Sequence, residues 1–403
     1  MNEQQIAKLA QLQYDYITSE IALEALCKEL SKAKVITLDT EFVRTRTLKP
    51  QLGLLQVFDG HHLALIDPVA INDLSAFTAI LQNPDIVKVL HSCSEDIDAL
   101  HSNLGVTPHP LFDTQFAASM LGKGASIGYA NLIETYFDIA LDKGESRTDW
   151  MARPLSSNQL DYAAADVTYL MAAFDELAAE LDEKGLRHCV FAESAALIEK
   201  KTVEFPSEYA YLTLSNNWKL SERSLYALKQ LAKWRLDTAR KNDIAINFVI
   251  KEASMLDIAV KLPQSTSGLH QIHDLYGKQV RLYGQDILAI THKAKHIDEN
   301  EFVPKIKRLI EFPLSKKAAS DIKQLVERVA AKHDIPAAVL ASKKQISQVL
   351  KWCWFELDET VLHGLRPDLL SGWRRELFIG DLETLFVEKG SEQQGKYETL
   401  RSL

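Results

Sequence analysis

The sequence predicts a mixed α/β domain in the first half of the chain and all-helical modules in the second half. Short apolar or β-branched runs at residues 35–38, 52–58, 63–66 and 86–90 have the length and composition of strands. From about Ser92 onward the apolar residues recur mostly at helical spacing. Strands followed by helices favour a sheet with helices packed on its faces.

The remaining elements of the first half follow from local signals. Apolar residues at helical spacing, among them Leu9 and Leu26, predict that residues 1–31 are helical. Gly60 and His61 predict a hairpin turn between the second and third strands. The stretch 199–217 contains Pro206 and paired asparagines, and we interpret it as a linker.

The second half contains a short internal repeat. Residues 239–244 align with residues 330–335 at an offset of about 91 residues, and each copy has a basic helix end, an Asp-Ile turn and a further helix. The repeat predicts two helical domains. The expected boundaries are an α/β domain at 1–205, helical domains at 210–292 and 293–380, and a polar, disordered tail at 388–403.

Charge is distributed unevenly along the 403 residues, whose net charge is −9. Residues 1–205 contain 16 Lys and Arg and 30 Asp and Glu, a net charge of −14, and the remainder has a net charge of +5. An acidic half can hold divalent cations and a basic half can hold phosphates, although incidental surface charge would explain the same numbers.

Composition also bears on the compartment. No apolar run reaches the roughly 18 residues of a membrane span, and the N-terminus has no signal-peptide pattern. The four cysteines are scattered without metal-binding spacing, so we expect reduced core residues. These features predict a cytoplasmic protein that does not bind membranes.

Acidic residues occur at three separate places in the predicted α/β domain. Asp39 and Glu41 are two apart in a strand and therefore share a face. Glu95 and Asp96 fall in the first turn of a helix that follows the fourth strand. Each group has an ordinary explanation when taken alone, as a solvated strand end or as helix capping.

The third acidic group lies on a helix whose start is well marked. Ser156 and Gln159 have the spacing of a capping box. Tyr162 and Asp166 are four residues apart and share a helix face, which alone would fit a surface hydrogen bond. The three alanines between them allow the helix to approach the sheet closely.

Taken together, the acidic residues indicate a metal site. Four carboxylates suit hard divalent cations such as Mg²⁺ or Mn²⁺. Hydrolysis of a phosphodiester by two ions needs such a cluster, with the ions roughly 3.5–4 Å apart and a carboxylate between them.

The three acidic segments resemble a known family. Residues 35–47, 91–100 and 159–170 are similar, in this order, to the three motifs of the ribonuclease D family, which belongs to the Asp-Glu-Asp-Asp superfamily of 3′–5′ exonucleases. Tyr162, four residues before Asp166, matches the tyrosine branch; the histidine branch has His at the position of Asp161. Residues 51–59 and 147–154 also look like this family, and the repeats resemble its paired HRDC domains, so the resemblance covers most of residues 30–375.

The resemblance implies a fold, a reaction and a substrate. The fold would be a ribonuclease H-like exonuclease domain, a mixed sheet flanked by helices, followed by two all-α HRDC domains. The protein would be a hydrolase that removes 5′-mononucleotides from the 3′ ends of RNA, including tRNA precursors and other structured RNAs. We expect it to act as a monomer with two divalent ions, Mg²⁺ or Mn²⁺. The alternatives are a non-catalytic RNA-binding scaffold and a DNA-directed proofreading exonuclease.

The resemblance also implies roles for individual residues. Asp39 would bridge both ions, Glu41 and Asp166 would complete the ion that activates water, and Asp96 would support the second ion. Tyr162 would orient the attacking water, because a phenol with a pKa near 10 is a poor base at pH 7.

Further residues are candidates for contact with the RNA strand. The candidate substrate-binding residues are Thr40, Phe42, Gln56, His91, Arg147, Trp150 and Arg153. Several of them fit equally well as core or structural residues. In the basic half, Lys233, Arg235, Arg240, Lys241, Trp373, Arg374 and Arg375 form two candidate RNA-binding clusters, for which a solvated helix face is the alternative.

Overall fold

The computed structural model describes residues 9, 11–141, 144–145, 147–392, 395–401 and 403. In this part of the chain, one mixed six-stranded sheet has the order β1-β4-β3-β2-β5-β6. The strands are β1 (Asp15–Ile17), β2 (Val35–Val43), β3 (Gln51–Phe58), β4 (Leu63–Ile66), β5 (Val87–Leu90) and β6 (Leu111–Asp113). Pairing is antiparallel between β2 and β3 and between β3 and β4, and it is parallel at the other three contacts.

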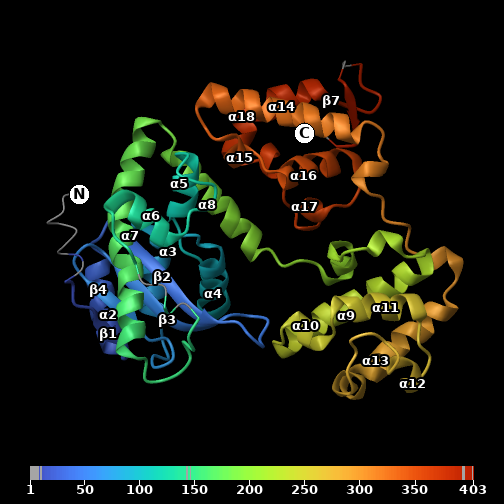
Figure 1. Cartoon of the computed structure of the whole chain (residues 1–403), viewed down its shortest axis with the longest axis horizontal. Helices are drawn as coiled ribbons and strands as arrows, with labels where there is room; N and C mark the ends of the chain where they lie inside the picture. The colour runs from blue at the N-terminus through green and yellow to red at the C-terminus, as the bar shows by residue number, and fades with distance from the viewer. Residues whose placement is uncertain (1–8, 10, 142–143, 146, 393–394, 402) are drawn as a thin grey trace.

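Helices cover both faces of this sheet, as predicted, and Figure 1 shows α7 lying across the blue strands. The helices of the α/β domain are α2 (Glu20–Leu30), α3 (Ser75–Gln82), α4 (Ser94–Leu104), α5 (Thr114–Met120), α6 (Tyr129–Phe137), α7 (Ser157–Glu183) and α8 (Arg187–Thr202). Ile36 and Leu38 of β2 pack into one apolar cluster with α2, α3 and α4. On the opposite face, β3 and β4 pack against α7.

The position of α7 follows from its sequence. Its capping box is formed as predicted, because Ser156 accepts from the amide of Gln159 and the Gln159 side chain accepts from the amide of Ser156. Ala163 is fully buried, so the helix backbone approaches the sheet closely. The hydroxyl of Thr37 on β2 donates to the carbonyl oxygen of Val167 at 2.8 Å, which fixes the helix over the strand that carries Asp39.

The second half contains two helical units. The first helical unit, residues 207–306, contains η1 (Ser207–Thr213), η2 (Asn217–Lys219), α9 (Glu222–Asn242), α10 (Ile246–Val249), α11 (Glu252–Lys261), α12 (Thr266–Leu269), α13 (Gly277–His296) and η3 (Glu299–Glu301). The second helical unit, residues 309–401, contains η4 (Leu309–Glu311), α14 (Ser315–His333), α15 (Ala337–Leu340), α16 (Lys343–Trp354), α17 (Glu359–Leu362), η5 (Asp368–Leu370), α18 (Gly372–Leu385), β7 (Phe386–Glu388) and β8 (Tyr397–Thr399).

The predicted repeat has a structural counterpart. Asp243 ends α9 and Asp334 ends α14, both in the left-handed conformation, with φ of 46° and 52°. Each aspartate also contacts the α/β domain: Asp243 accepts from the amide of Lys49 at 2.9 Å, and Asp334 pairs with Lys184 at 2.6 Å. The equivalent turn of each helical unit therefore faces the α/β domain, and Figure 1 shows the two units beside it in yellow and in orange to red.

Some sequence predictions about segments are wrong. Residues 1–31 were predicted to be helical, but strand β1 precedes α2; residues 1–8 and 10 lie outside the described residues. The predicted linker at 199–217 is much shorter, because α8 continues to Thr202 and residues 207–213 form η1, whose Tyr211 packs into the first helical unit.

The tail at 388–403 was predicted to be disordered, but its described residues are folded. Strand β8 pairs in parallel with β7. Tyr397 is buried and donates its hydroxyl to Asp321 at 3.2 Å. The prediction followed the mostly polar composition of the tail, although the buried aromatic ring of Tyr397 anchors it.

Among the described residues, none of the helices combines the length and apolar composition that a membrane span needs.

Candidate active site

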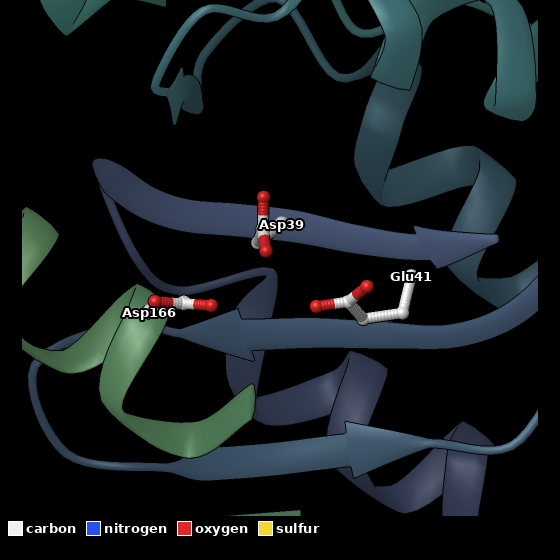
Figure 2. A group of neighbouring side chains, drawn as sticks. All are labelled: Asp39, Glu41 and Asp166. Carbon is white, nitrogen blue, oxygen red and sulfur yellow. The ribbon is translucent and has the colours of Figure 1, made fainter. Parts of the chain in front are cut away.

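Three carboxylates converge between strand β2 and helix α7. Asp39 and Glu41 share the face of β2 that carries Thr37, and Asp166 reaches them from α7. Ligand oxygens of Asp39, Glu41 and Asp166 all lie within 4.8 Å of one another. Figure 2 shows the three carboxylate groups converging from strand and helix. Oxygen ligands at this separation fit a hard divalent cation such as Mg²⁺ or Mn²⁺.

The electrostatics of the cluster favour a bound cation. Burial first, and then repulsion from Asp96, Asp166 and Glu41, raises the pKa of Asp39 well above its ordinary value. Burial, followed by the charges of Asp166 and Asp96, raises the pKa of Glu41 to about 9, and burial raises that of Asp166 to about 7. Buried carboxylates this close repel each other when ionised, and a divalent ion removes this penalty.

Asp96 lies beside the cluster but is not one of the three converging ligands. It is buried in the first turn of α4, and its Oδ1 accepts a hydrogen bond of 2.5 Å from the hydroxyl of Thr40. Burial raises the pKa of Asp96 to about 6, and the bond from Thr40 opposes that rise. Its charge also raises the pKa values of Asp39 and Glu41, so it belongs to the same electrostatic site.

Tyr162 stands one helical turn before Asp166 on α7. Burial, followed by the charges of Asp166 and Glu41, raises the pKa of its phenol further above the ordinary value. A hydrogen bond between the two side chains lowers the pKa of Asp166. Tyr162 therefore remains a hydroxyl donor at neutral pH and can orient a water molecule, but it cannot serve as the base.

A cavity of about 340 Å³ opens over the carboxylates, which is enough for one nucleotide. Asp39, Tyr162 and Asp166 line it on one side. The other lining residues are His91, Gly128, Tyr129, Ala130, Asn131, Leu141 and Leu170. The start of α6 thus forms part of the wall of this cavity.

Sequence reasoning missed that wall. Gly128 is the N-cap of α6, and Tyr129 follows it. The hydroxyl of Tyr129 donates to the carbonyl oxygen of Ala165, 36 residues later, at 3.0 Å. The only available signal was a Gly-Tyr pair at a helix start, and nothing in that pair indicates the contact with α7.

The predicted substrate residues separate into two groups. His91 lines the cavity, where its ring bonds the Thr114 hydroxyl at 2.9 Å and the Ile127 carbonyl at 3.0 Å. Burial lowers the pKa of His91, so the ring is neutral. Arg147 is exposed. Phe42 is partly buried and packs against the apolar cluster under α2, α3 and α4.

Four other predicted substrate residues are buried or bonded within the fold. Gln56 on β3 is fully buried and pairs with Asp39 on β2, so its side chain cannot contact an RNA strand in the cavity. Trp150 is 1% exposed and packs with β3, β4 and α7. Arg153 makes two bonds to Asp67, at 2.6 and 2.7 Å, and a third to the carbonyl oxygen of Gly53. Thr40 is also buried, bonded to Asp96.

The arginines of the predicted RNA-binding clusters are used largely within the fold. Arg235 is buried and bonds Asn247, and Arg240 bonds the Phe205 carbonyl oxygen. Arg374 is buried, pairs with Glu193 of α8 and donates to the Leu340 carbonyl at 2.9 Å. These side chains connect helices and domains. Their places in basic stretches of the sequence suggested RNA contact and gave no sign of these internal bonds.

Comparison with known proteins agrees with this architecture. The 3′–5′ exonuclease family profile matches residues 14–182, an HRDC domain profile matches 224–291, and the profile of the ribonuclease D C-terminal HRDC domain matches 313–382. The fold and the acidic site therefore define a 3′–5′ exonuclease followed by two helical HRDC units.

Full-length relatives specify the family. The chain is 41% identical to ribonuclease D of Escherichia coli (strain K12), covering 94% of this chain and 99% of that protein. It is 40% identical to ribonuclease D of Shewanella sp. (strain ANA-3), covering 96% and 97%. The crystal structure of E. coli RNase D, described as an exoribonuclease involved in structured RNA processing, superposes with a TM-score of 0.87 at 40% identity, covering 92% and 98%. The chain belongs to the ribonuclease D family and is a 3′–5′ exoribonuclease.

Proposed function

We propose that this exoribonuclease hydrolyses the terminal phosphodiester of RNA with two divalent ions, Mg²⁺ or Mn²⁺, and releases 5′-mononucleotides. The convergence of Asp39, Glu41 and Asp166 within 4.8 Å, with Asp96 adjacent, carries this proposal. Bound ions would lower the pKa of the attacking water and stabilise the charge that develops on the leaving oxygen.

The side chains have separate tasks in this reaction. The charges of Asp96, Asp166 and Glu41 all act on Asp39, so we assign Asp39 the bridging position; Glu41 and Asp166 would complete one ion, and Asp96 would support the other. Tyr162 donates its hydroxyl to the attacking water and aligns it with the phosphorus atom. The water loses a proton and its oxygen bonds to phosphorus; the bond between phosphorus and the 3′ oxygen of the preceding nucleotide breaks, and that oxygen takes up a proton.

We propose that the cavity over the carboxylates holds the 3′-terminal nucleotide. Its volume of about 340 Å³ accommodates one nucleotide, and His91, Tyr129 and Asn131 line the cavity where they can contact that nucleotide. The neutral ring of His91 adds no charge near the phosphate. The substrates we propose are tRNA precursors and other structured RNAs in the cytoplasm, bound by a monomer. Support for structured substrates comes from the description of the E. coli relative.

Incubation of the purified protein with a 3′-tailed tRNA and Mg²⁺ tests the reaction. We expect a ladder of products that shorten by single nucleotides, with 5′-mononucleotides released and no cleavage in excess chelator. Internal fragments, or equal turnover in chelator, would contradict the proposal.

Asp39→Asn, with Asp161→Asn as its matched control, tests the bridging carboxylate. Both variants remove one carboxylate, but Asp161 is exposed beside Tyr162 whereas Asp39 is in the cluster. We expect Asp39→Asn to lower kcat at least about a thousandfold with RNA binding retained, because one carboxylate holds both ions. Asp161→Asn should keep most of the activity. Equal activity of the two variants would refute the assignment.

A further inference from the structure

The cavity over the carboxylates has a wall that begins directly after a connecting segment. Residues 121–127 join α5 to α6, and residues 128–131, at the start of α6, line the cavity. We call residues 128–131 the cavity wall. Residues 122–126 are all exposed. Apolar packing of these exposed residues therefore contributes little to where the cavity wall starts.

Two side chains hold the residue that precedes the cavity wall. The side-chain amide of Gln115 on α5 donates to the carbonyl oxygen of Ile127 at 3.0 Å. Nε2 of His91 lies at the same distance, 3.0 Å, from that oxygen. A carbonyl oxygen only accepts hydrogen bonds, so both nitrogens carry the hydrogen. His91 lines the cavity and Gln115 does not. Gln115 thus bonds the same atom as a cavity residue while it lies outside the cavity.

These bonds also set the orientation of the His91 ring. The neutral ring has one N–H group, and the carbonyl oxygen of Ile127 requires that group to be Nε2. Nδ1 is then an acceptor for the hydroxyl of Thr114 at 2.9 Å, which can otherwise donate to the carbonyl oxygen of Leu90 at 3.1 Å. Because the protein engages both ring nitrogens, the face of the ring is what remains for contact with a nucleotide.

Tyr129 presents its ring to the cavity in the same way. Its hydroxyl is used by the carbonyl oxygen of Ala165, and its ring centroid lies 5.7 Å from that of His91, with the two planes tilted by 59°. Aromatic rings whose polar atoms are satisfied can contact a base by stacking. Such contact depends on where the rings lie. Ile127 bonds one of these rings and precedes the other by two residues.

We propose that Gln115 is a positioning residue for the 3′-terminal nucleotide. Its bond to the carbonyl oxygen of Ile127 holds the cavity wall and the ring of His91 in the places where they contact the nucleotide. Gln115 itself touches neither the RNA nor the ions. This inference rests on the proposed function, because it takes the terminal nucleotide as the occupant of the cavity.

The position of Gln115 predicts a particular kinetic effect. The cavity wall lies beside the nucleotide both before and during hydrolysis, so it contributes equally to binding of the substrate and of the transition state. Loss of such an interaction raises KM and leaves kcat nearly unchanged. A general defect in the fold would instead lower kcat.

Two substitutions of Gln115 separate its hydrogen bond from its bulk. Gln115→Met keeps the length of the side chain and removes the donor, whereas Gln115→Ala removes both. Ser119→Ala is the matched control, because Ser119 donates from the same helix to another carbonyl oxygen of the connecting segment, that of Gly124, at 3.0 Å. Neither Ser119 nor Gly124 lines the cavity. Thermal denaturation verifies that each variant is folded.

The readouts are KM and kcat for a single-stranded RNA in Mg²⁺, and the inhibition constant of 5′-AMP, which probes the cavity without the rest of the strand. Gln115→Met and Gln115→Ala should each raise KM and the inhibition constant by about 3- to 10-fold, the size of one hydrogen bond, with kcat changed less than about twofold. Ser119→Ala should change all three constants less than about twofold. Equal effects in Ser119→Ala and Gln115→Met, or a fall in kcat with KM unchanged, would overturn the proposal.

Two further outcomes are decisive. If Gln115→Ala raises the inhibition constant and Gln115→Met does not, the bulk of the side chain matters and the hydrogen bond has no positioning role. If 5′-AMP does not inhibit the wild-type chain, the cavity does not hold the terminal nucleotide, and the role of Gln115 fails together with that part of the proposed function. Stepwise hydrolysis by Gln115→Met with every constant unchanged would remove the role of Gln115 alone.

Discussion

The hydroxyl of Thr40 donates a hydrogen bond of 2.5 Å to the carboxylate of Asp96, and this bond connects strand β2 to helix α4. Thr40 sits between Asp39 and Glu41 but points to the opposite face of the strand. One strand therefore places two acidic residues on one face and positions a third from the other face. This side-chain bond joins the first two acidic motifs, in addition to the apolar packing of β2 against α4.

Thr40→Val should disturb Asp96 without removing any carboxylate. Because the bond from Thr40 lowers the pKa of Asp96, its loss should move that pKa upward from about 6. The acidic limb of the pH–rate profile should shift to higher pH, and kcat should fall by about tenfold, the size of one charge-assisted hydrogen bond. Thr40→Ser restores the donor and should restore the profile. If Thr40→Val and Thr40→Ser have the same pH profile, the bond has no role in catalysis.

Stability of the metal-free protein should decrease as pH rises. The pKa values of Asp96, Asp166 and Glu41 are raised to about 6, 7 and 9 in the fold. Below about pH 4 these carboxyls are protonated in both the folded and the unfolded chain, so they do not oppose folding. As pH rises toward 9 they ionise first in the unfolded chain, and their contribution to the free energy of unfolding is lost. Added Mg²⁺ should raise Tm more at pH 8 than at pH 5. A Mg²⁺ effect on Tm that does not depend on pH would contradict the coupled, buried state of the cluster.

Arg153 and Arg147 should behave differently although the sequence suggests the same role for both. Arg153 bonds Asp67, whose side chain is 2% exposed, so Arg153→Met would leave a buried carboxylate unpaired. We expect a loss of about 3–5 kcal/mol in the free energy of unfolding, measured by urea denaturation. Arg147 is exposed, so Arg147→Met should leave stability unchanged within about 0.5 kcal/mol. Equal stability of the two variants would refute the structural role of Arg153.

Gln56 offers a test of a buried polar group beside the metal ligands. It is fully buried opposite Asp39, and both polar atoms of its side chain lack a partner among the described residues. Gln56→Leu removes these atoms with little change of shape and should raise the free energy of unfolding of the metal-free protein by about 1 kcal/mol. Gln56→Glu, which adds a carboxylate beside Asp39, should lower it. Destabilisation by Gln56→Leu would show that the amide has a partner after all.

The central carboxylates could be predicted because each depends on a local pattern. Strand periodicity placed Asp39 and Glu41 on one face, and helical periodicity with a capping box placed Tyr162 and Asp166 on another. Their convergence was inferred from the order of the motifs, and the structure brings Asp39, Glu41 and Asp166 together.

Some other predictions failed, where burial or a long-range contact decides the role of a residue. The sequence does not reveal that Arg153 bonds Asp67, 86 residues away, or that Arg374 forms an ion pair with Glu193. A buried arginine and an RNA-binding arginine look the same in a basic stretch. The wall at Tyr129 was missed for the same reason, because its contact with α7 exists only in the folded chain.

A crystal structure of the protein in Mn²⁺, with anomalous scattering to locate the ions, tests the central claim most directly. Two anomalous peaks roughly 3.5–4 Å apart, with Asp39 bound to both, are the predicted result. A single peak, or two peaks of which neither contacts Asp39, would contradict the account.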